Sequence, residues 1–311
     1  MLNRRKFIQQ SVFTAGSVLA TSSAIPLFGE EITHKLTILH TNDTHSRLDP
    51  FPMDGSNNAG LGGVAARAKL IEEIRIKEEH VLLLDSGDFF QGTPYFNFYK
   101  GEPELKAMSK MGYEATTIGN HEFDAGMENL AKQLARNASF PAVICNYDFT
   151  RTPMENKIVP WKIIKKGELK IGITGLGIEM KGLVSEALYG ETKYLEPVQQ
   201  LNETAYLLKR KKDCDMVICL SHLGDKYDNN KVNDEILAKE TEYVDLILGG
   251  HTHRFFDAPH LYKNKKGDDV LVNQVGWAGI VLGRLDFIFF KNKKKNLDKN
   301  HSILIGKRPE E

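Results

Sequence analysis

The sequence predicts an α/β protein with a ligand site at the carboxyl edge of a sheet, and two observations support this prediction. Short apolar runs typical of buried strands alternate along the chain with longer segments whose apolar residues recur with a helical period. Polar residues capable of metal binding or acid–base chemistry directly follow several of these runs, which is where open α/β sheets bind ligands. The chain has 311 residues, enough for one large domain with its own core.

The composition is that of an ordinary globular protein, with 41% hydrophobic and 26% charged residues. Lys and Arg together number 41, as do Asp and Glu, so no net positive charge favours a nucleic-acid polymer as a partner. The three cysteines, Cys145, Cys214 and Cys219, are too few for a disulfide framework and are expected to be buried thiols.

Residues 1–30 have the pattern of an export signal. Arg4 and Arg5 are followed by an apolar residue two positions on and then by a mildly apolar stretch, which is typical of a twin-arginine signal peptide. We therefore expect a periplasmic or otherwise exported protein whose functional domain comprises residues 31–311. The alternative is an N-terminal membrane anchor, although the stretch is short and rich in hydroxyl groups for a stable membrane span.

Residues 35–40 are predicted to form the first strand, which runs directly into Asp43 and His45. Residues two apart in an extended chain face the same way, so a carboxylate and an imidazole lie on one side. Such a pair suits a divalent metal ion. The alternative is an Asx-turn beside a surface histidine, and these two residues alone do not decide between the interpretations.

The next predicted strand also leads to a carboxylate. A helix is predicted from residue 62 to residue 77, and residues 80–84 are apolar enough to form a strand buried on both faces. Asp88 follows this strand, directly after Gly87. A buried carboxylate needs a cation or a pairing partner, and no Lys or Arg lies nearby in the sequence.

The densest group of polar side chains lies at residues 119–124, with the sequence Gly-Asn-His-Glu-Phe-Asp. A β-branched run at residues 114–118 precedes it, and a predicted helix at residues 125–136 follows it. An amide, an imidazole and two carboxylates therefore meet in a strand-to-helix loop. Asn120 and His121 in such a loop can also be simple caps or turn formers, so the other strand ends are needed to identify a site.

The second half of the chain continues the alternation. The predicted elements are a strand at 141–145, a hairpin at 161–176, a helix at 197–212, strands at 216–220 and 244–248, and closing antiparallel strands at 270–272, 274–277 and 280–290. A lysine-rich run at 291–295 is interpreted as a solvated loop rather than a nucleic-acid surface. No internal repeat or low-complexity linker divides this part of the chain, so one domain is the simplest interpretation.

Histidines follow the predicted strands more often than chance placement explains. His222, His251 and His253 come directly after the strands at 216–220 and 244–248. Together with those in the earlier loops, five of the ten histidines occupy such positions. A single histidine there is usually a core or surface residue, but the repetition indicates one shared site.

These motifs resemble the calcineurin-like metallophosphoesterase superfamily. The matching blocks, in the order of that family, are Asp43-x-His45, Gly87-Asp88, Gly119-Asn120-His121-Glu122, His222 after a strand, and Gly249-Gly250-His251-x-His253. Residues 40–45, 119–124 and 274–283 are similar in particular to its 5′-nucleotidase branch. The resemblance extends from about residue 36 to residue 289. It implies that residues 31–311 are a catalytic domain with the metallophosphoesterase fold, a four-layer α/β/β/α sandwich of two mixed sheets.

The resemblance also implies a centre of two divalent metal ions bridged by Asp88. The other implied ligands are Asp43, His45 and His253 for one ion, and Asn120, His222 and His251 for the second. Mixed oxygen and nitrogen ligands suit Mn, Zn, Fe or Co better than Ca or Mg. In the resembling enzymes the histidine at position 121, oriented by Asp124, stabilises the transition state or protonates the leaving group. Asn120 and His121 are the implied substrate-binding residues, and Glu122 is expected to be structural.

The implied function is hydrolysis of a small phosphoester, most directly by a 5′-nucleotidase-type phosphomonoesterase. Full-length members of that branch carry a second, nucleoside-binding C-terminal domain, whereas this chain ends at Glu311 shortly after its last predicted strand. A separately encoded C-terminal domain is therefore an expected partner if nucleotides are the substrate. The alternatives are a broad phosphodiesterase, a sulfur-oxyanion ester hydrolase, and a non-catalytic metal-binding subunit. The presence of both His121 and Asp124 argues against the last of these.

Overall fold

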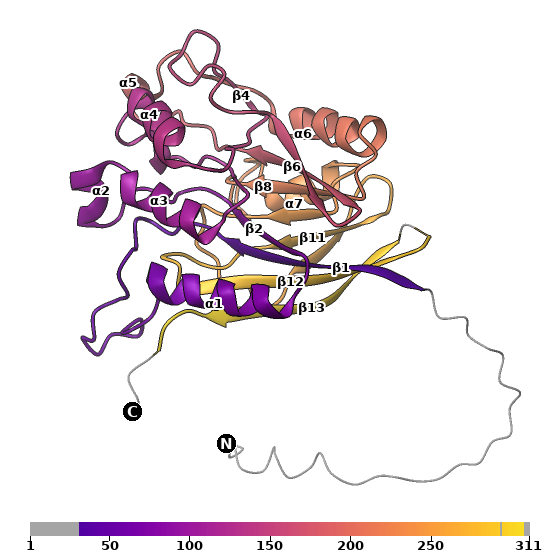
Figure 1. Cartoon of the computed structure of the whole chain (residues 1–311). Helices are drawn as coiled ribbons and strands as arrows, with labels where there is room; N and C mark the ends of the chain where they lie inside the picture. Colours follow the sequence, from indigo (N-terminus) through magenta and orange to yellow (C-terminus); the bar gives the residue numbers. More distant parts are fainter. Residues whose placement is uncertain (1–30, 293, 308–311) are drawn as a thin grey trace, which may run out of the picture. The chain divides into compact units, whose positions relative to one another are not determined.

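The computed structural model describes residues 31–292 and 294–307 (Figure 1). The chain from Ile32 onward forms one compact unit. The predicted signal peptide at residues 1–30 lies outside the described residues. Within the described part, no helix combines the length and apolar character that a membrane span requires.

The first of two mixed sheets contains the strands that carry most of the early site residues. Its order is β13-β12-β1-β2-β3, with β1 (Ile32–Thr41), β2 (Val81–Asp85), β3 (Ala115–Thr116), β12 (Val281–Phe290) and β13 (Lys295–Leu304). Strands β1, β2 and β3 run parallel, whereas β12 is antiparallel to both of its neighbours. The carboxyl ends of β1, β2 and β3 therefore lie at one edge.

The second sheet contains six strands in the order β10-β11-β9-β8-β6-β5. They are β5 (Trp161–Lys166), β6 (Leu169–Leu176), β8 (Met216–Ser221), β9 (Leu246–Leu248), β10 (His260–Lys263) and β11 (Asp269–Asn273). The four inner strands run parallel and the two edge strands run antiparallel to them. A separate two-stranded ladder joins β4 (Tyr147–Asp148) to β7 (Lys193–Tyr194).

Helices flank both sheets (Figure 1). They are α1 (Val64–Lys77), α2 (Pro94–Tyr99), α3 (Glu102–Met111), α4 (Met127–Asn137), α5 (Glu186–Tyr189), α6 (Pro197–Tyr206), which continues as a π-helical turn (Leu207–Lys211), and α7 (Asp234–Glu240). A short 3-10 turn at His121–Phe123 lies within the densest polar loop.

Three apolar cores separate the layers, because successive side chains of a strand point to opposite faces. On β1, Leu36 and Ile38 belong to the core between the sheets, whereas Leu39 belongs to the core that includes residues of α1, α3 and α4. On the other sheet, Val217 and Cys219 pack in a third core with residues of α6 and α7. This arrangement confirms the α/β/β/α sandwich of two mixed sheets.

Several elements predicted from local patterns are confirmed. Helix α1 begins at Val64, directly after Gly63, and the hairpin at 161–176 forms as β5 and β6. The turn of this hairpin contains Gly167, whose φ of 58° is easily adopted only by glycine. All three cysteines are free and buried, as expected.

Two predicted strands are wrong. Residues 141–145 form only isolated bridges, Thr116 with Ala142 and Val143 with Val159. The Cys145 N–H instead bonds the Gly175 carbonyl of the second sheet, so this segment crosses between the sheets. Residues 274–277 leave β11 at Asn273 and form a loop that is hydrogen-bonded to the segments following β1 and β9.

Other differences come from pairing between distant segments. Strand β11 runs parallel to β9 rather than closing the fold as an antiparallel strand. The strand β13, which pairs with β12 over its length, was not predicted because its sequence is mostly polar and exposed and lacks apolar alternation. Edge strands of this kind are specified by their neighbour more than by their own sequence.

Candidate active site

Five loops carry the predicted site residues, and each follows the carboxyl end of a strand. These residues are Asp43 and His45 after β1, Asp88 after β2, Asn120 and His121 after β3, His222 after β8, and His251 and His253 after β9. Three groups of their donor atoms, each within 4.8 Å of one another, could hold a metal ion. The two sheets therefore bring to one place residues more than 200 positions apart.

The first group of candidate ligands consists of Asp43, His45 and His253. The Nε2 atoms of the two histidines lie 2.9 Å apart. Asp43 Oδ1 lies 3.9 Å from His45 Nε2 and 3.4 Å from His253 Nε2. Donors bound to one ion at about 2.0–2.2 Å are separated by about 3–4 Å, so this spacing fits a shared metal ion.

The second group consists of Asp88, His222 and His251. His222 Nε2 lies 3.0 Å from Asp88 Oδ2, and Asn120 Oδ1 lies 3.0 Å from His251 Nδ1. Asp88 also forms the third group with His45 and His121. Its carboxylate therefore lies between the two sets of donors.

The buried ring of His222 shows that the site favours a positive charge. Its Nδ1 lies 2.6 Å from the Ser86 carbonyl and donates to it, which leaves Nε2 directed toward Asp88 and Asp43. Within the described part of the chain, Nε2 is buried and has no partner of hydrogen-bond geometry. Burial lowers the pKa of His222, but the carboxylates of Asp88 and Asp43 outweigh burial and raise that pKa to about 10. A divalent cation at Nε2 would be stabilised by the same two carboxylates, so these donors fit a metal ion.

The loops that carry the candidate metal ligands have an unusual backbone conformation. Asp43, His45, Asp88, His251 and His253 all have φ between 46° and 69°. Residues other than glycine rarely adopt this left-handed conformation, and such conformations concentrate at functional sites. The loops therefore hold carboxylates and imidazoles on strained backbone, as functional sites often do.

Two glycines allow the loops to approach the ligands closely. A Cβ at Gly250 would lie 3.0 Å from His222 Nδ1 and 3.1 Å from Asp43 Oδ2. A Cβ at Gly119 would lie 2.7 Å from His222 Nε2 and would clash with Asp88. Any larger residue at these positions would push the candidate ligands out of place.

Asn42 and Gln274 support the metal loops, and no local pattern in the sequence assigned them a role. Asn42 Nδ2 donates to Asp43 Oδ2 and to the Gly276 carbonyl, both at 2.6 Å. Gln274 Nε2 donates to the Gly250 carbonyl at 2.8 Å. The segment at 274–277, predicted as a strand, thus joins the first metal loop to the last one.

Glu122 joins its own loop, which follows β3, to the loop that follows β2, and it does so from a fully buried position. Its Oε2 accepts the N–H groups of Asp88 and Gly119 at 2.9 and 2.7 Å, and its Oε1 accepts the N–H of Phe90 at 3.0 Å. Three backbone donors on one carboxylate fix the position of the loop that carries Asp88. This gives Glu122 a structural role.

His121 lies at the rim of the cluster and is paired with Asp124. His121 Nδ1 is 2.8 Å from Asp124 Oδ2, and the His121 N–H donates to Asp88 Oδ1 at 2.9 Å. The hydrogen bond to Asp124 is the main reason why the pKa of His121 is raised to about 9. The ring lies 5.3 Å from that of His45 and is about a third exposed, so it faces both the cluster and solvent.

A sequence profile of the family described as calcineurin-like phosphoesterase matches residues 36–255. The chain belongs to this family. It is 35% identical over 297 residues to snake venom 5′-nucleotidase of Gloydius brevicauda, covering 88% of this chain and 48% of that protein. It is 33% identical over 299 residues to the 5′-nucleotidase of Vibrio cholerae, covering 88% and 52%.

A solved structure shows the same relationship. The 5′-nucleotidase precursor of Thermus thermophilus superposes with a TM-score of 0.79 and 32% identity, covering 88% of this chain and 55% of that one. The chain thus spans about half the length of the relatives that it matches. Calcineurin-like phosphoesterases use divalent metals, and the three donor groups of this chain fit that chemistry.

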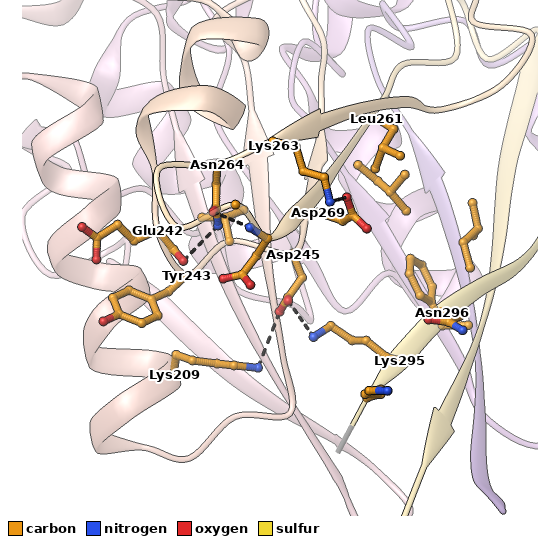
Figure 2. Close-up of a pocket in the computed structure, with 17 residues that line it drawn as sticks. Lys209, Glu242, Tyr243, Asp245, Leu261, Lys263, Asn264, Asp269, Lys295 and Asn296 are labelled. Carbon is orange, nitrogen blue, oxygen red and sulfur yellow. Dashed lines mark hydrogen bonds and ion pairs between the residues drawn. The ribbon is translucent and has the colours of Figure 1, made fainter. Parts of the chain in front are cut away.

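A cavity of about 750 Å³ is lined by none of the candidate metal ligands (Figure 2). Its lining includes Asp245, which directly precedes β9, and Asp269 and Lys295, which begin β11 and β13. The metal-site loops instead follow the carboxyl ends of strands. Figure 2 shows Asp245 between Lys209 and Lys295, at 3.8 and 2.6 Å from their Nζ atoms. This carboxylate is therefore neutralised by its neighbours and takes no part in the candidate active site.

Proposed function

We propose that residues 31–311 form a catalytic domain that hydrolyses phosphoesters with two divalent metal ions, as a 5′-nucleotidase-type phosphomonoesterase. The observation that supports this most strongly is the position of Asp88 between two sets of donors. One set contains Asp43, His45 and His253, and the other contains Asn120, His222 and His251. Because the donors mix oxygen and nitrogen atoms, Mn, Zn, Fe or Co are the ions expected.

Divalent ions bound there supply Lewis-acid activation of the phosphoryl group and of a nucleophilic water. The residues of this chain supply the remaining chemistry. Asp124 accepts the Nδ1 proton of His121, which leaves the opposite edge of the ring free to donate a proton to the leaving oxygen or to stabilise its charge. Asn120 lies beside His121, and its amide nitrogen offers a donor for a phosphoryl oxygen.

The nucleotide as substrate is a proposal supported by the relatives, which are named 5′-nucleotidases. The nucleoside would be recognised either by residues of this domain or by a nucleoside-binding domain supplied as a separate chain.

The deciding experiment compares three esters on the purified protein with Mn²⁺ present: AMP, p-nitrophenyl phosphate and bis(p-nitrophenyl) phosphate. We expect hydrolysis of both monoesters and little hydrolysis of the diester. Hydrolysis of p-nitrophenyl phosphate but not of AMP would indicate that a second chain must recognise the nucleoside. Loss of all three activities with every divalent metal would contradict the proposal and favour a non-catalytic subunit.

Export is proposed from the twin-arginine pattern at residues 1–30. We expect the native protein to be periplasmic or secreted and to begin after this segment. Cell fractionation followed by N-terminal mass spectrometry tests both points. A protein that keeps Met1 and sediments with membranes would instead support an N-terminal anchor.

A further inference from the structure

The ring of the candidate ligand His253 is held differently from the other imidazoles of the cluster. Metal-binding histidines usually donate their second ring N–H to a protein acceptor, which fixes the ring. His222 Nδ1 donates to the Ser86 carbonyl at 2.6 Å, and His45 Nδ1 lies 3.4 Å from the Phe90 carbonyl oxygen. Among the described residues, none forms such a hydrogen bond with His253 Nδ1, and this side chain is 40% exposed. The orientation of its ring must therefore come from another contact.

That contact is with the indole ring of Trp277. The two ring centroids lie 5.8 Å apart and the ring planes differ by only 10°, which is the geometry of an offset stack. The stack leaves His253 Nε2 directed at the other candidate ligands, 3.4 Å from Asp43 Oδ1 and 2.9 Å from His45 Nε2. The indole thus packs against the imidazole without blocking its ligand atom.

The backbone on both sides of Trp277 is tied to the loops that carry candidate ligands. The Gly276 N–H donates at 2.8 Å to the carbonyl of Arg254, which directly follows the last candidate ligand. The Ala278 N–H donates at 2.7 Å to the Asp43 carbonyl. Gly276 and Ala278 have φ of 76° and 55°, so the chain turns sharply on either side of the indole. This turn fixes where the side chain of residue 277 begins.

Packing holds the indole ring itself. Phe51 packs edge-on against Trp277 with centroids 5.9 Å apart, and the Arg47 guanidinium lies 4.1 Å from the centre of the Phe51 ring. Both aromatic rings also pack against a small buried apolar cluster, formed by Leu61, Val275, Ala278, Ile280 and Val281. The indole is therefore a rigid support for the exposed imidazole rather than a mobile surface group.

The stack also favours the metal-bound form of the imidazole over the free form. An imidazole that binds a divalent cation carries more positive charge than a free neutral one, and the electron-rich face of an indole attracts positive charge. The ring contacts of Trp277 within the described chain are with His253 and Phe51. The effect is therefore confined to the first group of candidate ligands.

We propose that Trp277 is a positioning residue that orients His253 and so raises the affinity for the metal ion held by Asp43, His45 and His253. The inference rests on the metal centre of the proposed function, and it adds a residue that itself binds neither metal nor substrate. It implies that the two metal ions depend differently on residue 277.

The first test is titration of the metal-free full protein with Co²⁺, followed by visible absorbance and calorimetry. Trp277→Leu keeps an apolar side chain and removes the flat ring, so we expect one of two Co²⁺ sites to weaken at least roughly tenfold while the other is unchanged. Trp277→Phe keeps a ring that can stack and should restore most of the affinity. The control is Trp161→Leu, which removes the other tryptophan of the chain, on β5. Wild-type affinities in Trp277→Leu, or equal weakening in Trp277→Phe, overturn the inference.

A second measurement leaves residue 277 intact and so does not depend on the folding of its variants. In Trp161→Phe, Trp277 is the only tryptophan and the source of the indole fluorescence. Paramagnetic Co²⁺ bound through the stacked imidazole should quench this emission, with saturation at the same concentration as one of the two sites. Unchanged emission when both sites are filled overturns the inference.

Neither measurement needs a substrate, so the inference and the proposed function can fail separately. If Co²⁺ binds in the expected pattern but no phosphoester is hydrolysed, the proposed function fails and the role of Trp277 stands. If phosphoesters are hydrolysed and Trp277→Leu binds both ions as the wild-type protein does, the role of Trp277 is overturned and the proposed function stands.

Discussion

Asp124 orients His121 at the rim of the cluster of candidate metal ligands, with 2.8 Å between Asp124 Oδ2 and His121 Nδ1. His121 begins the turn at His121–Phe123 and Asp124 directly follows it, so one short segment positions both the imidazole and its carboxylate partner. Neither side chain is fully buried. The pair is therefore placed to act on a substrate that enters from solvent.

Replacing His121 by alanine should reduce turnover of AMP by roughly 10²–10⁴, the usual contribution of an acid–base group. Because p-nitrophenolate leaves without help from an acid, the loss should be smaller for p-nitrophenyl phosphate. Metal content should be retained. Steady-state kinetics on both esters, with metal analysis by mass spectrometry, checks this expectation. Equal losses on the two esters would instead assign His121 to charge stabilisation.

Asp88→Asn should abolish both metal retention and activity, since this carboxylate lies between the two groups of donors. His251→Ala should disrupt only one group of metal donors, so the variant should retain part of the metal. The matched control is Asp245→Asn, because Asp245 pairs with Lys209 and Lys295 at the cavity shown in Figure 2. Metal-to-protein ratios after gel filtration are the measurement. A fully active Asp88→Asn protein would falsify the assigned centre.

Glu122→Gln tests the loop that carries Asp88. The carboxylate of Glu122 accepts three backbone N–H groups, and an amide in its place would direct its own donors at one or two of them. An unsatisfied buried group costs about 1–3 kcal/mol, so the melting temperature and the metal affinity should both fall.

The control for this variant is Glu128→Gln, because Glu128 is exposed on α4. Thermal unfolding with and without added Mn²⁺ measures the two effects. Wild-type behaviour of Glu122→Gln would mean that its hydrogen bonds do not hold the loop.

The sequence predicted which polar side chains lie close together better than it predicted the strands. His222 and His251 follow apolar runs whose buried character is local, so their place at strand ends could be inferred. The roles of Asn42 and Gln274 depend on hydrogen bonds to residues more than 20 positions away in the sequence, and 234 positions away in the case of Asn42. No local sequence pattern encodes such contacts.

The same limit applies to the strands. The polar strand β13 forms because β12 offers it an edge, and its own residues show no apolar alternation. Residues 141–145 have the apolar composition of a strand but cross between the sheets, where only isolated bridges form. Composition indicates burial in both cases better than it indicates pairing.

Stability should decrease on acidification because of His40. This histidine is fully buried on β1, and its Nε2 accepts a hydrogen bond from Asn273 Nδ2 at 2.8 Å. Burial lowers its pKa from 6.5 to about 3. Between these values the unfolded chain binds a proton that the folded protein does not bind, so stability is fully present above about pH 6.5 and is lost as the pH falls toward 3.

The expected loss from this one group is on the order of 4–5 kcal/mol, at about 1.4 kcal/mol per unit of pKa. His40→Gln, which keeps an acceptor for Asn273, should reduce the slope of unfolding free energy against pH between about 6.5 and 4. Urea unfolding at a series of pH values measures this slope. His301→Gln, at an exposed position of β13, serves as the control. If both variants keep the wild-type slope, other groups must bind the protons on unfolding, and His40 is then not the source of acid sensitivity.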